Sequence, residues 1–387
     1  MTALRCMTAG ESHGPALTAI VEGFPAGVAL DTALIDYELK RRQGGYGRGK
    51  RQTLETDRVI VESGTYHGVT TGAPIALRLV NNDAKLERLL EPTAPRGGHV
   101  DLAGSINYQT GIRQVLERAS ARETAIRVAA GALCKTLLRE LNIHVYGYVR
   151  SLGGIDAPPL SSDLSVRDAS PVYTLNPAVD SAIVAAIDSA KEAGDTLGGV
   201  VETIVLNCPI GLGSHAQWDR KLDARIALAV MSVQAIKGVE IGLGFEAARR
   251  PGSHVMDPID FDPAHSSEDR RFGFRRPSNN AGGIEGGTSN GEPIVVRAAK
   301  KPISTLAART RSVNMETKAP QPASYERSDV CAVPAASVIV ENVVAFEIAA
   351  AVVEKYVGTS LAAIKAAMAA IHELDRKLLD DRGDRGS

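Results

Sequence analysis

Two histidines in this chain are flanked by glycines, His13 in the segment GESHG and His99 in the segment RGGHVD. Glycine lets the backbone approach a bound ligand closely. An imidazole, with an unperturbed pKa of about 6.5, transfers protons at neutral pH. Two such histidines in one cleft could act as two general acids; the alternative is that they cap nearby carbonyl groups. A Ser–His hydrolase is disfavoured, because Ser12 and His13 are adjacent and no G-x-S-x-G segment occurs.

Basic residues gather in two stretches that contain no acid. The 387-residue chain has 44 Lys and Arg against 45 Asp and Glu, a formal net charge of −1. Residues 40–51 nevertheless hold six basic residues and residues 293–315 hold five. Arginine presents planar, bidentate donors to phosphate and carboxylate, so these stretches predict binding of a small, highly charged anion. The alternatives are solvated surface and a Gly/Arg patch for nucleic acid, although only Tyr46 supplies an aromatic ring to such a patch.

A predicted helix begins near Ser120, where the S-x-x-E pattern of Ser120 and Glu123 is typical of a capping box. The residues just before it, Arg118 and Ala119, would lie at the free N–H groups of the helix start, which favour anions. A purely structural cap is the alternative.

Three later segments also carry groups suited to ligands. Residues 279–291 contain five glycines, and residues 301–305 (KPIST) combine a cation with two hydroxyls. Arg327 precedes Asp329, and a carboxylate beside arginine stays ionised and can act as a base. The alternatives are a flexible loop for residues 279–291 and a surface ion pair for Arg327 and Asp329.

The composition excludes several classes of protein. Charged residues make up 23% and apolar residues 44%, which disfavours wholesale disorder. The four cysteines are far apart and form no Cys/His cluster, so reduced thiols are expected and a metal site is not. There is no signal-peptide core, and no run approaches the 18 to 20 or so apolar residues that span a bilayer. These features predict a cytoplasmic protein; the dinucleotide and P-loop fingerprints are also absent.

The periodicity predicts a single mixed α/β unit. Residues 91–111 and 251–292 are expected to be long loops, the second of them functional. A charged, frayed tail is expected at 381–387. Helices are predicted at 31–42, 120–142, 178–193, 220–236, 341–356 and 360–380, and strands within 17–30, 58–66, 74–80, 143–150, 198–206, 238–245 and 293–299.

Taken together, these segments resemble the chorismate synthase family. The motifs occur in the family's order over essentially the whole chain: GESHG, RRQGGYGRG, RGGHVDLAG, RASARETAIRVAAGA, QAIKGVEIGLGF, NNAGGIEGGTSNGEPI, KKPIST and RSDVCAVPAA.

The resemblance implies a lyase with a single α/β domain over 1–387, a β-α-β sandwich that assembles as a homotetramer. It implies 1,4-anti elimination of phosphate from 5-enolpyruvylshikimate 3-phosphate to give chorismate, the last common step of the shikimate pathway. Reduced FMN is required without net redox change, and NADPH is a possible reductant. No nucleic-acid or membrane partner is implied. A nucleic-acid-binding protein and a flavin-independent phosphate-ester hydrolase remain the alternatives.

The resemblance also implies roles for individual residues. His13 would protonate the departing phosphate, His99 would protonate the reduced flavin, and Asp329 would help to remove the ring proton. Arg42 and Arg48 would bind an anion, either substrate or NADP. The flavin would be held by Arg118, Ala119, Ser120, Gln234, Ala235, Gly286, Lys301, Pro302, Ile303, Ser304, Thr305 and Arg327. Many members have Ser where this chain has Ala119, and some have Asn where it has Gln234.

Overall fold

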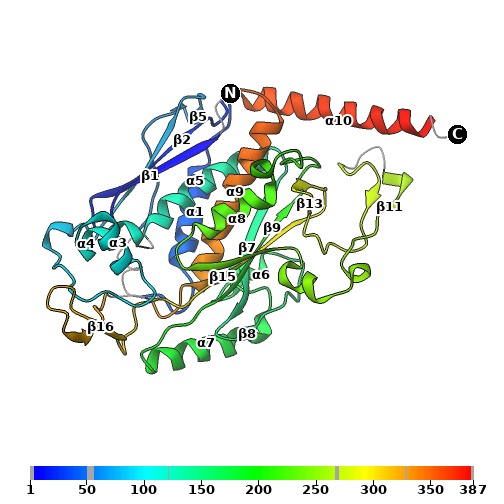
Figure 1. The fold of residues 1–387 in the computed structure, drawn as a ribbon. Helices are drawn as coiled ribbons and strands as arrows, with labels where there is room; N and C mark the ends of the chain where they lie inside the picture. The colour runs from blue at the N-terminus through cyan, green and yellow to red at the C-terminus, as the bar shows by residue number, and fades with distance from the viewer. Residues whose placement is uncertain (1–3, 50–55, 121, 266–269, 327–328, 385–387) are drawn as a thin grey trace.

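The computed structural model describes residues 4–49, 56–120, 122–265, 270–326 and 329–384, which form two antiparallel sheets with helices between them (Figure 1). One sheet has the strand order β1-β2-β6-β3, with β1 at Arg5–Ala9, β2 at Ala16–Glu22, β3 at Ile60–Val61 and β6 at Ile75–Val80. The other has the order β10-β15-β9-β7-β8, with β7 at His144–Leu152, β8 at Ile155–Asp156, β9 at Gly199–Leu206, β10 at Ile236–Ile241 and β15 at Ile294–Lys300. The expected β-α-β sandwich is confirmed.

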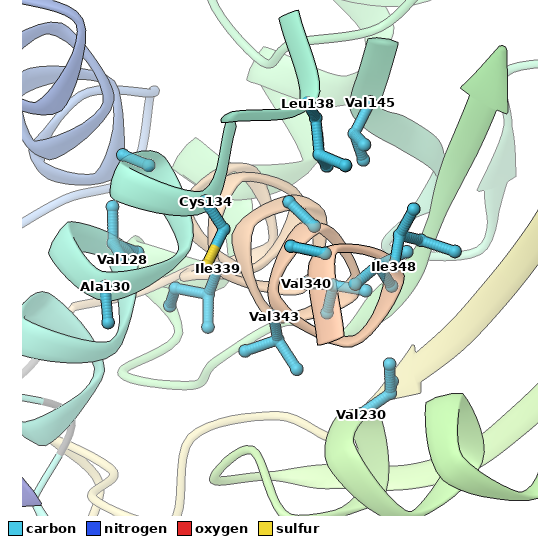
Figure 2. Close-up of a cluster of buried hydrophobic side chains, with 14 of the residues drawn as sticks. Val128, Ala130, Cys134, Leu138, Val145, Val230, Ile339, Val340, Val343 and Ile348 are labelled. Carbon is cyan, nitrogen blue, oxygen red and sulfur yellow. The ribbon is translucent and has the colours of Figure 1, made fainter. Parts of the chain in front are cut away.

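Three helices form the middle layer: α1 (Thr32–Gln43), α5 (Glu123–Glu140) and α9 (Val333–Lys355). Helix α5 packs against β1, β2 and β6, whereas α9 packs against β7, β9 and β15, and the two helices pack against each other. Figure 2 shows Cys134 of α5 beside Ile339 of α9, with Val340 and Val343 in the same buried cluster. The helical layer therefore joins both sheets into one hydrophobic core.

Shorter elements surround this sandwich. The remaining helices are α3 (Asp101–Tyr108), α4 (Ile112–Ala119), α6 (Val166–Ala169), α7 (Pro177–Glu192), α8 (Leu222–Met231) and α10 (Leu361–Asp384). The remaining strands are β4 (Thr65–Tyr66), β5 (Val69–Thr70), β11 (Asp260–Phe261), β12 (Phe274–Arg275), β13 (Ile284–Glu285), β14 (Thr288–Ser289), β16 (Arg311–Val313) and β17 (Pro320–Pro322), paired as hairpins.

Helix α9 is apolar on nearly every side, which is typical of a helix at the centre of a core. It is long and apolar enough to cross a membrane, so the expectation that no such stretch occurs is wrong. In this fold, 83% of its most apolar window is buried between α5 and the five-stranded sheet. The composition of α9 is thus accounted for by its place in the sandwich.

The contact between α5 and α9 depends on one glycine. A Cβ atom added at Gly131 would lie 2.1 Å from the backbone oxygen of Asn342 in α9. No side chain fits there, so Gly131 allows the two helix backbones to approach.

Several local signals act as the sequence predicts. Asp31 caps α1, its Oδ1 accepting a hydrogen bond from the Leu34 N–H at 2.9 Å. Asn142 follows α5 in the left-handed conformation, with φ of 57°. In β2, Leu17, Ala19 and Val21 are buried, as alternation requires.

Other predictions are wrong. Residues 91–111 are not all loop, because α3 begins at Asp101, and α4 was not predicted. Ser120 does not cap α5: it follows the end of α4, and its hydroxyl lies 2.7 Å from that of Ser12. The Glu123 carboxylate accepts from Thr8 and Gln234 instead, so tertiary partners have replaced the capping box.

Helix ends also differ from the predictions. Helix α8 ends at Met231 rather than near 236, and α9 begins at Val333 rather than near 341. Helix α10 continues to Asp384, into the predicted frayed tail, and residues 385–387 lie outside the described part. The predicted loop 251–292 contains the β11–β12 and β13–β14 hairpins.

Candidate active site

His13 lies in the loop between β1 and β2, and a buried amide holds that loop. The Asn81 Nδ2 group donates to the backbone oxygens of Glu11 and Gly14, at 3.1 and 2.8 Å. At Gly10, φ is 107° and an added Cβ would lie 2.4 Å from the Ala16 oxygen, so only glycine fits. The backbone around His13 is therefore fixed before any ligand binds.

The imidazole of His13 is paired with Glu117, at the end of α4. Its Nδ1 lies 2.9 Å from Glu117 Oε1, and the His13 backbone N–H donates to Oε2 at 2.8 Å. Arg113 donates to the same carboxylate at 3.3 Å. Burial opposes ionisation of Glu117, but hydrogen bonds and charge from His13, together with Arg113, hold its pKa below the ordinary value.

His99 has a partner of the same kind at the start of α3. Its Nδ1 lies 2.5 Å from Asp101 Oδ1, and Arg96 donates to both oxygens of Asp101, at 2.8 and 2.9 Å. Burial again opposes ionisation, yet the hydrogen bonds from His99 and Arg96 hold the Asp101 pKa well below its ordinary range. Asp101 thus stays a carboxylate beside the ring.

The KPIST segment lies against the His99 loop. The Ser304 hydroxyl donates to the Gly98 oxygen at 2.9 Å and accepts from Lys301 Nζ at 2.8 Å. Arg96 Nη1 donates to Thr305 Oγ1 at 3.0 Å. The fold therefore brings a predicted acid beside a predicted cofactor-binding segment.

The Arg118–Ser120 segment lies beside the His13 loop. Arg118 is exposed and donates to Thr8 Oγ1 at 2.7 Å and to the Gly10 oxygen at 3.2 Å. Gln234 donates to Glu123 at 3.1 Å, while its own Oε1 is buried without a hydrogen-bond partner. This buried amide oxygen fits a donor on a bound group.

Ala235 continues this row of predicted cofactor residues towards the KPIST segment. Its backbone oxygen accepts from the Lys301 N–H at 2.9 Å, and its φ is 68°. Gln234 and Ala235 thereby connect the two predicted cofactor segments.

The basic loop contacts the predicted base. Arg48 Nη1 lies 2.5 Å from Asp329 Oδ2, and the Gly49 N–H donates to Oδ1 at 2.6 Å. Lys300 is close enough that burial, followed by repulsion from Arg48, lowers its pKa to about 8. Asp329 therefore lies among cations.

Arg42 is buried in an ion pair and is not displayed on the surface. Its Nη2 donates to Asp57 at 2.9 Å, and Arg122 donates to the other oxygen of Asp57 at 2.5 Å. Burial, together with repulsion from Arg122 and Arg48, lowers the Arg42 pKa to about 10 despite Asp57. The Nε atoms of Arg42 and Arg48 are both buried without a hydrogen-bond partner.

One predicted cofactor residue, Gly286, is not brought into this group. Gly286 lies in the β13–β14 hairpin, where the neighbouring Gly287 oxygen accepts from Leu222 at the start of α8. Gln234 follows the other end of α8, about 15 Å further along for a ten-residue helix. Arg327 lies outside the described residues.

A cavity of about 470 Å³ opens between β1 and α8. None of its lining residues is a predicted site residue, although Thr8 and Glu123 also contact Arg118 and Gln234. Within the described ranges, no group of three His, Cys, Asp or Glu side chains is placed to hold a metal ion.

The sequence analysis missed both carboxylate partners. Asp101 stands two residues after His99 within a quoted motif, so its position was a usable signal. Glu117 is separated from His13 by 104 residues, and its only signal in the sequence is its position next to Arg118, a predicted cofactor residue.

The fold and the site together provide two histidine–carboxylate pairs and a cationic flank, groups of the kind with which an enzyme can transfer protons to and from an anionic small molecule. The profile of the family described as "Chorismate synthase" matches residues 4–353. The chain belongs to the chorismate synthase family, and the prediction of a lyase is confirmed with it.

Individual relatives agree along the whole chain. The chorismate synthase of Geobacter metallireducens is 53% identical over 379 residues, covering 94% of this chain and 96% of that protein. That of Enterococcus faecalis is 50% identical over 386 residues, covering 94% and 97%. A solved structure titled "Crystal Structure of Chorismate Synthase" is 41% identical, with a TM-score of 0.79, and covers 97% of this chain and 99% of the other.

Proposed function

We propose that this chain converts 5-enolpyruvylshikimate 3-phosphate into chorismate by 1,4-anti elimination. The substrate loses phosphate and one ring proton, so the overall reaction is redox-neutral. The family and the names of its relatives support the product. The observation that carries the site assignment is the contact of the His99 loop with residues 301–305 through Ser304 and Arg96.

The residues present fit reduced FMN as the cofactor. Gln234 offers a buried, unpartnered oxygen, while Arg118 and Lys301 offer cations on the two flanking segments. Reduced FMN, when bound, supplies an electron transiently and recovers it. The residues proposed to hold it are Arg118, Ala119, Ser120, Gln234, Ala235, Lys301, Pro302, Ile303, Ser304 and Thr305, with Gly286 and Arg327 as further proposals from the family resemblance.

The chain's own groups then handle the protons. His13 donates a proton to the departing phosphate, and His99 holds a proton for the flavin beside Lys301 and Ser304. Asp329 accepts the ring proton, while Arg48 and the Gly49 N–H hold its carboxylate in place. Arg48 and Lys300 provide positive charge for the phosphate and carboxylates of the substrate, while Arg42 supports this flank from its buried pair with Asp57.

An anaerobic assay with substrate and chemically reduced FMN tests the proposal. We expect chorismate and phosphate in equal amounts, and no turnover with oxidised FMN. A shikimate-type alcohol as product would instead support a hydrolase, and salt-steep binding of single-stranded RNA would support a nucleic-acid-binding protein. Replacing chemical reduction by NADPH decides whether the chain reduces its own flavin.

We also propose a cytoplasmic homotetramer. Large apolar side chains are exposed at Trp218, Phe245 and Phe261, by 74%, 74% and 56%. Aromatic side chains are enriched at the surfaces by which protein chains bind one another. The mass in solution, measured by light scattering, checks the assembly.

A further inference from the structure

Both proposed acids belong to triads built alike, although their sequences are unrelated. In each, an arginine donates to a carboxylate, and the carboxylate faces Nδ1 of the histidine: Arg113–Glu117–His13 and Arg96–Asp101–His99. The side chains of Glu117 and Asp101 are each only 1% exposed. An ionised, buried carboxylate can only accept, so the hydrogen on the facing ring nitrogen is assigned to Nδ1.

The contacts around His13 agree with this tautomer. Its other nitrogen, Nε2, lies 3.9 Å from Asp83 Oδ2, beyond hydrogen-bonding distance. Asp83 is itself bonded by Lys85 at 2.8 Å. The charged groups facing the ring are therefore Glu117, with Arg113 behind it, and Asp83, with Lys85 beside it.

The contacts around His99 lead to the same conclusion. Arg96 Nη2 approaches Nδ1 at 3.2 Å, but the carboxylate oxygen of Asp101 is closer, at 2.5 Å. Arg96 can only donate, so it forms no hydrogen bond with a ring nitrogen that itself carries a hydrogen. Its approach to Nδ1 is then a van der Waals contact. Lys301 lies across the loop, bound to Ser304.

We propose that Glu117 and Asp101 are positioning residues that accept the Nδ1–H of His13 and His99 and so assign proton transfer to Nε2 in both. The inference rests on the proposed roles of the two histidines. Each carboxylate also holds the orientation of its ring through this hydrogen bond, as the second partner of a functional histidine commonly does.

The first experiment measures turnover of Glu117→Gln and Asp101→Asn with reduced FMN across pH. We expect kcat to fall about tenfold or more, part of the 10²–10⁴ that a general acid contributes. The dependence of kcat on pH should also change in both variants, because a negative charge beside the ring is gone. Wild-type kcat and an unchanged pH profile in both variants would overturn the inference.

A double-mutant cycle separates positioning from general damage. If Glu117 acts through His13, adding Glu117→Gln to His13→Ala lowers single-turnover phosphate release no further. Additive losses would contradict the inference. If His13→Ala alone keeps full turnover, the proposed acid role fails and the positioning role fails with it; an inactive His13→Ala beside a fully active Glu117→Gln overturns the positioning role alone.

Two variants guard against a folding defect. Glu117→Asp keeps the charge and should keep the wild-type pH profile at a reduced kcat. If Glu117→Gln unfolds or no longer quenches FMN fluorescence, Glu117→Asp decides the question. A shifted pH profile of turnover in Glu117→Asp would then overturn the inference. Asp180→Asn is the matched control, because Asp180 is a buried carboxylate in α7 that accepts from Thr174 and has no histidine partner among its described contacts; its turnover should equal that of the wild type.

Discussion

The carboxylate of Asp329 receives two donors, Arg48 and the Gly49 N–H, before any substrate is present. Both donors fix the orientation of the carboxylate that is proposed to accept the ring proton. At the scale of the residue, the basic loop therefore holds the proposed base, in addition to the charge proposed to bind the anionic substrate.

We expect Asp329→Asn to lower kcat by about 10² or more, because the amide keeps the shape but accepts no proton. FMN binding should persist, as measured by fluorescence quenching. Asp188→Asn is the control, since the one hydrogen bond found for its carboxylate among the described residues comes from the Tyr46 hydroxyl of the basic loop. Equal activity of the two variants would remove Asp329 from the mechanism.

A site residue can be predicted from the sequence when its neighbours in the chain carry a signal. His13 and His99 stand out because glycines flank them. Their carboxylate partners could not be selected from among the chain's many acidic residues, because Glu117 contacts His13 only after the chain has folded. The pairing of Arg48 with Asp329 joins positions 281 residues apart and is invisible for the same reason.

At the scale of the element, two of the three helices absent from the prediction, α3 and α4, carry Asp101 and Glu117 (Figure 1). Each is only eight residues long, and too short to show a clear helical period. Helices α1 and α7 and most strands of the two sheets agree with the prediction, because their periods are local. The Ser120 capping box gave a wrong prediction for the opposite reason. Its local signal is clear, but Ser120 contacts Ser12 and Glu123 accepts from Gln234 in the folded chain.

Gly131→Ala tests the approach of α5 to α9. The added Cβ would meet the Asn342 backbone at 2.1 Å, so the helices must separate. We expect a loss of about 1–3 kcal/mol in the free energy of unfolding, measured by urea denaturation. Gly252→Ala is the control, because nothing lies within 4 Å of its added Cβ; a loss as large at Gly252 would discount the interhelical contact.

At the scale of the whole molecule, a buried ionic cluster connects distant elements of the sandwich. Glu341 of α9 contacts Arg41 of α1, Lys135 of α5 and Arg167 of α6, and accepts from the Gly147 N–H of β7 at 2.9 Å. Burial opposes its ionisation, but the three cations outweigh burial and hold its pKa well below the ordinary value of 4.5. The ionic cluster therefore connects the helical layer to the five-stranded sheet.

Glu341→Gln should lower the free energy of unfolding by about 3–5 kcal/mol at pH 7, because it leaves buried cations uncompensated. The contribution of the carboxylate is fully present above pH 4.5 and is lost as pH falls towards its depressed folded value. Urea unfolding at pH 7, 5, 4 and 3 should therefore show the wild type and the variant converging in acid. A difference that stays constant with pH would contradict this origin.

The central position of α9 has a consequence for the synthesis of the protein. Every strand of the two sheets precedes Val333 in the chain, so the ribosome makes both outer layers before the helix that the five-stranded sheet packs against. Until α9 emerges, the inner faces of β7, β9 and β15 lack their main helical partner and expose apolar surface. The nascent chain must therefore be protected from aggregation until late in translation.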